Sequence, residues 1–141
     1  MPRILKRIES VVPRRASGYG GKARNLAALA RAGFPVPVAY AMPGWVADSF
    51  LSSVLDIADR PRGLLRDPYV SDARLERIAQ RVREATLPQD VVASVRDALL
   101  AMTDEGASGF AVRSSGTHED QEGASSAGMH STLLNLVREE D

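Results

Sequence analysis

The sequence contains no cysteine, which excludes a disulfide framework, a thiolate metal site and a cysteine nucleophile. Aromatic residues are also scarce, with one Trp, three Tyr and three Phe in 141 residues. There is no apolar run of membrane-spanning length, and the first residues lack the apolar stretch of a signal peptide. We therefore expect one cytoplasmic globular domain with a thin core of packed helices, rather than a large β-sandwich.

The chain also lacks net charge, because 18 Lys and Arg balance 18 Asp and Glu, yet the two ends differ in sign. Residues 1–40 hold eight basic residues and one acid, a charge of +7, whereas residues 102–141 hold two basic residues and eight acids, a charge of −6. A basic end can attract phosphates, and the two ends can equally be solvated faces that pair with each other. Only two residues are lysines, so Lys22 stands out.

Apolar spacing and capping signals predict four helices. The first covers residues 22–32 and is ended by Gly33, and the second runs from Gly44 to about Ile57. The third is capped by Ser71 or Asp72, and the fourth is opened by Pro88. Short apolar runs predict strands at 110–112 and 132–137. Two prolines exclude a helix over residues 35–42 and allow an edge strand, and residues 59–70 are predicted as a loop.

A glycine-rich segment, Gly18-Tyr19-Gly20-Gly21-Lys22, precedes the first predicted helix. Its backbone N–H groups and its lysine could converge on an anion at the helix N-terminus, although a simple glycine turn is the favoured interpretation of this segment alone. The segment is not a Walker A loop, because Ala16 and Ala23 stand where that loop needs Gly and Ser or Thr.

Arg113 follows the strand predicted at 110–112 and begins a loop rich in glycine and hydroxyl groups. Ligand sites form at strand ends in α/β sheets, and a guanidinium can hold phosphate oxygens with two hydrogen bonds. A structural ion pair with Glu119 or Asp120 is the alternative for this residue, and the local sequence does not decide between the two.

Two further polar segments do not carry a chemical signature. His118-Glu119-Asp120 lacks a metal-ligand spacing to His130, the one other histidine, so an exposed polar turn is the favoured interpretation. The segment 123–128 departs from a serine-hydrolase nucleophile elbow, because Ala127 stands where that motif needs glycine. We therefore assign no catalytic residue and no metal ligand to this chain.

Two segments together resemble the N-terminal part of the ATP-binding domain of pyruvate phosphate dikinase, which phosphoenolpyruvate synthase and rifampicin phosphotransferase share. The first is Gly20-Gly21-Lys22-Ala23-Arg24-Asn25-Leu26, followed by Ala32-Gly33-Phe34-Pro35-Val36-Pro37. The second runs from Ala111-Val112-Arg113-Ser114-Ser115-Gly116-Thr117-His118-Glu119-Asp120 through Ala124-Ser125-Ser126-Ala127-Gly128-Met129-His130-Ser131-Thr132-Leu133-Leu134-Asn135. The family usually has alanine at the position of Gly116 and a bulky residue at that of Ser126.

The resemblance implies an α+β fold, the N-terminal lobe of an ATP-grasp domain, with helices packed on a small sheet. Residues 1–17 would be a lead-in, and residues 18–141 would form part of the ATP-binding domain. The sequence stops soon after the strand predicted at 132–137 without a closing element, so we expect a truncated lobe.

The resemblance also implies site residues. In the family the glycine–lysine segment and the arginine after the strand hold ATP phosphates, and these positions correspond to Lys22 and Arg113. The glycine and the threonine of the later segment approach the nucleotide, and they correspond to Gly128 and Thr132. The Mg²⁺ ligands of the family belong to a second lobe, which has no counterpart before Asp141.

The implied function is the ATP-binding part of a phosphoenolpyruvate synthase-like phosphotransferase, which converts ATP to AMP and phosphate while a carrier histidine passes a phosphoryl group to pyruvate. A rifampicin phosphotransferase-like lobe, a non-catalytic nucleotide-binding fragment and a remnant with a structural role are the alternatives. We expect the chain alone to be catalytically incomplete. A separate chain with the second lobe and the phosphohistidine domain is a candidate partner, whereas nucleic acid and membranes are not.

Overall fold

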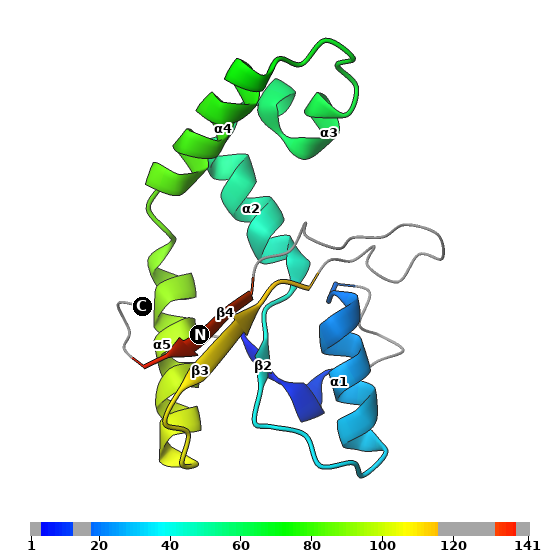
Figure 1. Ribbon diagram of the computed structural model, residues 1–141, viewed down its shortest axis with the longest axis vertical. Helices are drawn as coiled ribbons and strands as arrows, with labels where there is room; N and C mark the ends of the chain where they lie inside the picture. The colour runs from blue at the N-terminus through cyan, green and yellow to red at the C-terminus, as the bar shows by residue number, and fades with distance from the viewer. Residues whose placement is uncertain (1–3, 13–17, 116–131, 138–141) are drawn as a thin grey trace. The chain divides into compact units, whose positions relative to one another are not determined.

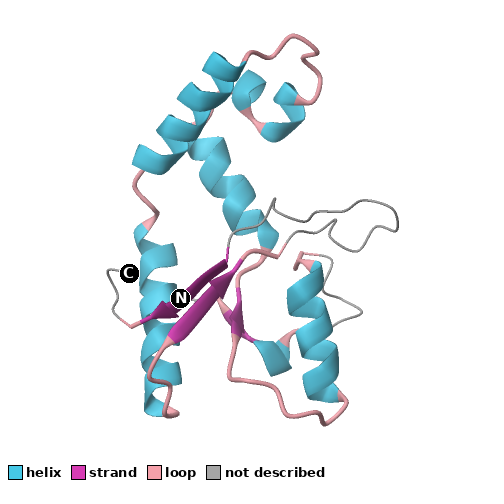
Figure 2. Cartoon of the chain, viewed as in Figure 1, coloured by secondary structure: helices cyan, strands magenta, loops and turns pink. Residues whose placement is uncertain are grey.

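The computed structural model describes residues 4–12, 18–115 and 132–137. These residues form a mixed α/β structure with five α-helices and two antiparallel two-stranded sheets (Figures 1 and 2). The chain divides into two compact units: unit 1 comprises Met1–Gly44 and Asp90–Asp141, and unit 2 comprises Trp45–Gln89. The mixed helix and strand content predicted from the sequence is confirmed.

The elements follow one another in this order: β1 (Lys6–Arg7), the 3₁₀ turn η1 (Ile8–Ser10), α1 (Gly21–Arg31), β2 (Tyr40–Ala41), α2 (Gly44–Val54), the 3₁₀ turn η3 (Ile57–Asp59), α3 (Pro61–Leu64), α4 (Asp72–Glu84), α5 (Gln89–Asp104), β3 (Phe110–Arg113) and β4 (Thr132–Leu136). All four predicted helices and both predicted strands are present. The segment predicted as an edge strand contributes only the two residues of β2.

Helix α1 ends where the sequence predicts. Gly33 adopts a left-handed φ of 83°, which glycine tolerates best. The N–H of Phe34 donates to the carbonyl of Leu29 at 3.1 Å, and the N–H of Gly33 donates to that of Ala30. These bonds satisfy carbonyls that the end of a helix would otherwise leave without partners.

The core of unit 1 lies between α1 and the β1–β2 pair. Its buried members are Ile8, Val11, Ala27 and Ala41, and Ala27 is fully excluded from solvent. Leu26, Leu29, Ala30 and Phe34 recur at helical spacing in the sequence, but Leu29 and Phe34 are exposed. Leu26 does pack against this core, and the small side chain of Ala27 is buried beside Ile8 of η1 and Ala41 of β2.

An ion pair joins the first strand of unit 1 to the end of α5. The Arg7 guanidinium donates to both carboxylate oxygens of Glu105, at 2.5 Å and 2.7 Å, across 98 positions of the sequence. These hydrogen bonds lower the pKa of Glu105 below its ordinary value. At this point the basic and acidic ends of the chain pair with each other, which is one of the two interpretations of the charge asymmetry.

Strands β3 and β4 form an antiparallel pair with an irregular register. Val112 lies opposite Leu133 and Arg113 opposite Thr132, whereas Phe110 lies opposite Leu136. The span from Leu133 to Leu136 is therefore one residue longer than the facing span of β3, which defines a β-bulge. Apolar side chains of this pair are exposed, among them Val112, Leu133 and Leu134.

Unit 2 contains helices α2, α3 and α4. The Ser71 hydroxyl accepts a hydrogen bond from the N–H of Arg74 at 3.3 Å, which confirms Ser71 as the predicted N-cap of α4. The loop predicted at 59–70 is wrong in part, because it contains α3 and the end of η3. The Arg74 side chain holds this segment in place by donating to the carboxylates of Asp59 and Asp67, at 2.8 Å and 2.7 Å.

None of the helices in the described ranges combines the length and the hydropathy needed to cross a bilayer.

Candidate functional site

The N-terminal end of α1 lies against the end of β3 (Figure 1). The Lys22 ammonium donates a hydrogen bond to the carbonyl oxygen of Ser114 at 3.0 Å, across 92 positions of the sequence. Beside it, the N–H of Ala23 donates to the hydroxyl of Ser115 at 3.3 Å. The two segments that carry the sequence motifs therefore meet in unit 1.

Gly20 is the N-cap of α1, and its lack of a side chain decides how the two segments fit. An ideal Cβ at Gly20 would lie 1.9 Å from the carbonyl oxygen of Ser115 and 2.3 Å from its hydroxyl oxygen. Glycine cannot cap a helix through a side chain, and the Ser115 hydroxyl supplies that hydrogen bond instead. Gly20 thus permits a direct approach of the α1 terminus to the main chain that follows β3.

The glycine-rich segment is also anchored at its other end. The carbonyl of Gly18 accepts a hydrogen bond from the N–H of Gly44 at 2.6 Å, and Tyr19 packs against the core of unit 1. Burial raises the pKa of the Tyr19 phenol. The segment is a glycine turn with a fixed position, and this conformation is compatible with either interpretation drawn from the sequence.

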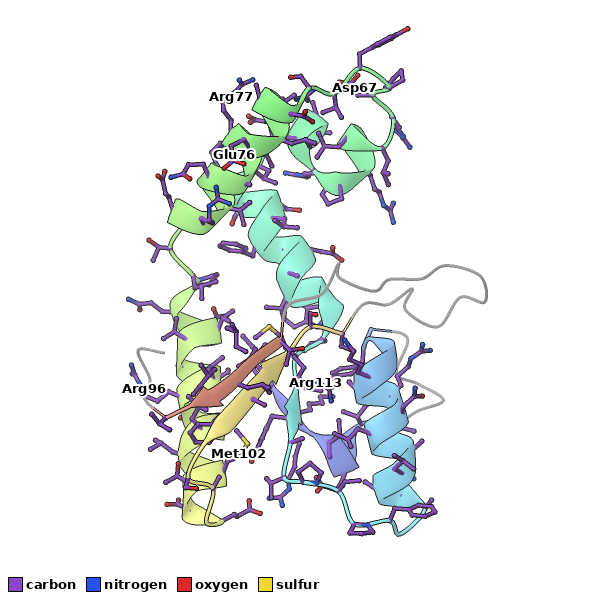
Figure 3. The ribbon with its side chains drawn as sticks, in the orientation of Figure 1. Asp67, Glu76, Arg77, Arg96, Met102 and Arg113 are labelled. Atoms are coloured by element: carbon purple, nitrogen blue, oxygen red, sulfur yellow. The ribbon has the colours of Figure 1, made fainter. Side chains whose placement is uncertain are left out.

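The structure pairs two further predicted site residues. Arg113, labelled in Figure 3, is the last residue of β3, one position before Ser114. It lies directly opposite Thr132 of β4. Directly opposed residues of an antiparallel pair project to the same face of a sheet. Lys22 contacts the residue after Arg113, so Lys22, Arg113 and Thr132 belong to one region of unit 1.

The remaining candidates lie outside the described residues. These are Gly128, the segment His118-Glu119-Asp120, His130 and the stretch 123–128. The ion-pair alternative for Arg113, with Glu119 or Asp120, falls there as well. Among the residues that the structure does describe, no group of three His, Asp or Glu side chains is arranged to hold a metal ion.

Sequence patterns alone missed the part that Gly20, Ser114 and Ser115 play in the site. All three lie inside the motifs, but their contacts join residues more than ninety positions apart. The one sequence signal for these contacts was Gly20 itself. It directly precedes a helix and has no side chain with which to cap that helix.

A glycine-rich helix N-terminus beside a strand-end arginine is an arrangement typical of phosphate-binding α/β proteins. The chain belongs to the family of the pyruvate phosphate dikinase AMP/ATP-binding domain, whose sequence profile matches residues 17–141. Membership of this family implies a nucleotide ligand.

The curated relatives are probable phosphoenolpyruvate synthases. That of Methanocaldococcus jannaschii is 32% identical over 127 residues, which are 83% of this chain and 10% of the relative. That of Staphylothermus marinus is 32% identical over 133 residues, 86% of this chain and 16% of the relative. That of Archaeoglobus fulgidus is 34% identical over 129 residues, 86% of this chain and 17% of the relative.

The chain therefore spans less than a fifth of the length of each of these relatives. No solved structure matches it significantly.

Proposed function

We propose that this chain is the N-terminal lobe of an ATP-grasp domain and holds the phosphates of ATP through Lys22 and Arg113, with Thr132 and Gly128 beside them. The observation that carries the proposal is the hydrogen bond from Lys22 to the carbonyl of Ser114, because it joins the two motif segments. The proposed domain begins at residue 18, and the lead-in contributes Ile8 and Val11 to the same core.

The two cations suit different parts of a phosphate chain. A lysine ammonium is a point charge on a long, flexible stem, whereas an arginine guanidinium offers a planar fork that matches two phosphate oxygens. The Ser114 carbonyl is neutral, so its contact orients the Lys22 ammonium without cancelling the charge. The partial positive charge at the start of α1 adds to the attraction for an anion.

The named relatives favour a phosphoenolpyruvate synthase-like phosphotransferase over a rifampicin phosphotransferase-like one. In that scheme this chain supplies nucleotide contacts, and the second lobe and the phosphohistidine carrier come from another chain or a further part of the protein. The described residues do not offer a ligand set for Mg²⁺, so no step is assigned to that ion here.

Binding of ATP to the purified chain, measured by titration calorimetry, tests the phosphate contacts. We expect Lys22→Ala and Arg113→Ala each to weaken binding by about ten-fold or more, since a charge-assisted hydrogen bond contributes roughly 1.5–3 kcal/mol. Binding should also fall with added salt. Arg31→Ala is the matched control, because Arg31 is an exposed residue at the other end of α1. Equal effects of all three substitutions, or no ATP binding by the unmodified chain, would refute the proposed site.

Formation of AMP tests whether this chain alone is catalytically incomplete, as proposed. The chain with ATP, Mg²⁺ and pyruvate should form no AMP above background, because positioning by one lobe alone does not complete the phosphoryl-transfer site. Steady AMP formation that depends on the protein would show that the chain is a complete enzyme.

A further inference from the structure

Unit 2 contains a cavity of about 530 Å³ that is separate from the nucleotide site proposed for unit 1. One wall is a face of α2, formed by Asp48, Leu51 and Ser52, which share a helix face because they are three and four positions apart. The other wall is the segment between Ile57 and Arg66, which contains η3 and α3. Its volume lies within the range of small-molecule sites, roughly 300–1,000 Å³.

The second wall has its shape because α3 packs directly onto the backbone of η3. An ideal Cβ at Gly63 would lie 2.5 Å from the carbonyl oxygen of Ile57 and 2.6 Å from that of Ala58. Any larger residue at position 63 would force these two short elements apart. The close approach brings Arg60, Arg62 and Arg66 to one cavity within a short stretch of chain.

The cavity is rich in positive charge. Three arginines line it against a single acid, Asp48. Arg60 donates to the carbonyls of Ser52 and Leu55 at 2.8 Å and 3.2 Å, so its hydrogen bonds go to neutral acceptors at the end of α2. These bonds fix the guanidinium in place without forming an ion pair.

Of the four other arginines in unit 2, three differ from these, and the fourth, Arg77, is exposed and has no ion pair to a carboxylate of the described residues. Arg74, Arg81 and Arg83 each form an ion pair with an Asp or Glu side chain. Arg62 and Arg66 are exposed, and neither forms an ion pair with a carboxylate of the described residues. Their charges are therefore available to an anion that enters the cavity.

We propose that this cavity binds a small organic phosphate with two negative charges. The guanidinium groups of Arg62 and Arg66 hold the phosphate oxygens, and Arg60 reinforces their field from its anchored position. Leu51 and Ile57 supply apolar contact for the carbon skeleton, and Ile57 is 78% exposed. A concave site that combines charged groups with a few apolar side chains suits a small molecule better than an extended polymer.

The test is a titration of the full, isotope-labelled chain with glycerol 3-phosphate, followed by amide chemical shifts. We expect saturable shifts at residues 57–66, none of comparable size with uncharged glycerol, and the same response in Lys22→Ala, whose substitution affects only the site in unit 1. The double substitution Arg62→Gln with Arg66→Gln should weaken binding by roughly ten-fold or more. The double substitution Arg62→Lys with Arg66→Lys keeps both positive charges and should therefore retain part of the binding affinity.

The control carries the same loss of charge at two exposed arginines that do not line the cavity, Arg31→Gln with Arg77→Gln. It should bind as the unmodified chain does, and spectra of both Gln variants should show intact folds. Absence of shifts at residues 57–66 would overturn the proposal. Equal weakening in the control would also overturn it, since it would reveal only general attraction to a basic surface. Neither result would affect the ATP-binding proposal, which depends on Lys22 and Arg113.

Discussion

The Cα atom of Gly20 lies directly against the main-chain carbonyl of Ser115, with no room for a side chain between them. This relationship fixes the distance between the start of α1 and the end of β3. It is therefore the contact on which the geometry around Lys22 and Arg113 depends.

Gly20→Ala should destabilise the chain. The added Cβ would meet the carbonyl and the hydroxyl of Ser115 at 1.9 Å and 2.3 Å, so the backbone must shift. Overpacking of this kind typically costs about 1–3 kcal/mol. Gly18→Ala is the matched control, because a Cβ there has nothing within 4 Å. Urea unfolding of the two variants measures the difference, and equal midpoints would contradict the described contact.

Ser115→Ala should remove the hydrogen bond that caps α1 from outside the helix. We expect a loss of about 0.5–2 kcal/mol in the free energy of unfolding, as for other N-cap substitutions. Ser53→Ala removes an exposed serine hydroxyl that bonds only within its own helix, to the carbonyl of Phe50, and should change stability little. A Ser115 variant as stable as the Ser53 variant would show that the Ala23 N–H does not need this partner.

The helices of this chain could be predicted from its sequence because their signals are local. The apolar spacing of α4 and α5, the cap at Ser71 and the stop at Gly33 each act within a few residues. The strands β3 and β4 were likewise marked by short apolar runs.

What the sequence could not predict depends on distant partners. Strand β1 consists of Lys6 and Arg7, which form a strand only because β2 pairs with them. The short elements η3 and α3 depend on the absence of a side chain at Gly63 and on hydrogen bonds from Arg74 to Ala58 and Asp59. For the site, the proximity of Lys22 to the end of β3 was implied only by the family resemblance, since no spacing rule connects residues so far apart.

The ion pair between Arg7 and Glu105 should make stability depend on acid. Hydrogen bonds from Arg7 lower the pKa of Glu105 in the folded chain, so the pair stabilises the fold at neutral pH. The ordinary pKa of a glutamate is about 4.5. The stabilisation is complete above that pH and is lost as the pH falls from there through the lowered pKa of Glu105. Glu105→Gln should reduce the urea midpoint at pH 7 and change it less at pH 3.

Glu76→Gln is the control for this experiment, because Glu76 pairs with Arg83 on the exposed surface of α4. Arg83 makes one hydrogen bond to a Glu76 side chain that is 75% exposed and contributes little to stability, whereas Arg7 holds Glu105 with two. An acid dependence that is the same in the Glu105 and Glu76 variants would exclude the Arg7 contact as its source.

The exposed apolar residues of β3 and β4 should make the purified chain self-associate. Val112 and Leu133 lie opposite each other and are 56% and 52% exposed. Light scattering over a range of concentrations should show an increase in mass, and Val112→Thr with Leu133→Thr should reduce it. Leu65→Thr alters a side chain exposed in unit 2 and should leave association unchanged. A monomeric unmodified chain at all concentrations would contradict this expectation.

The division of the chain has a consequence for the order in which its parts fold. Unit 1 is assembled from two stretches, Met1–Gly44 and Asp90–Asp141, which flank the whole of unit 2. Its contacts, such as Arg7 with Glu105 and Lys22 with Ser114, close loops of more than ninety residues, whereas Arg74 reaches Asp59 across only 15 positions. Long loops lose more chain entropy on closure, and non-local contacts slow folding. Unit 2 should therefore form early, and by shortening the path between the two stretches it would speed the assembly of unit 1.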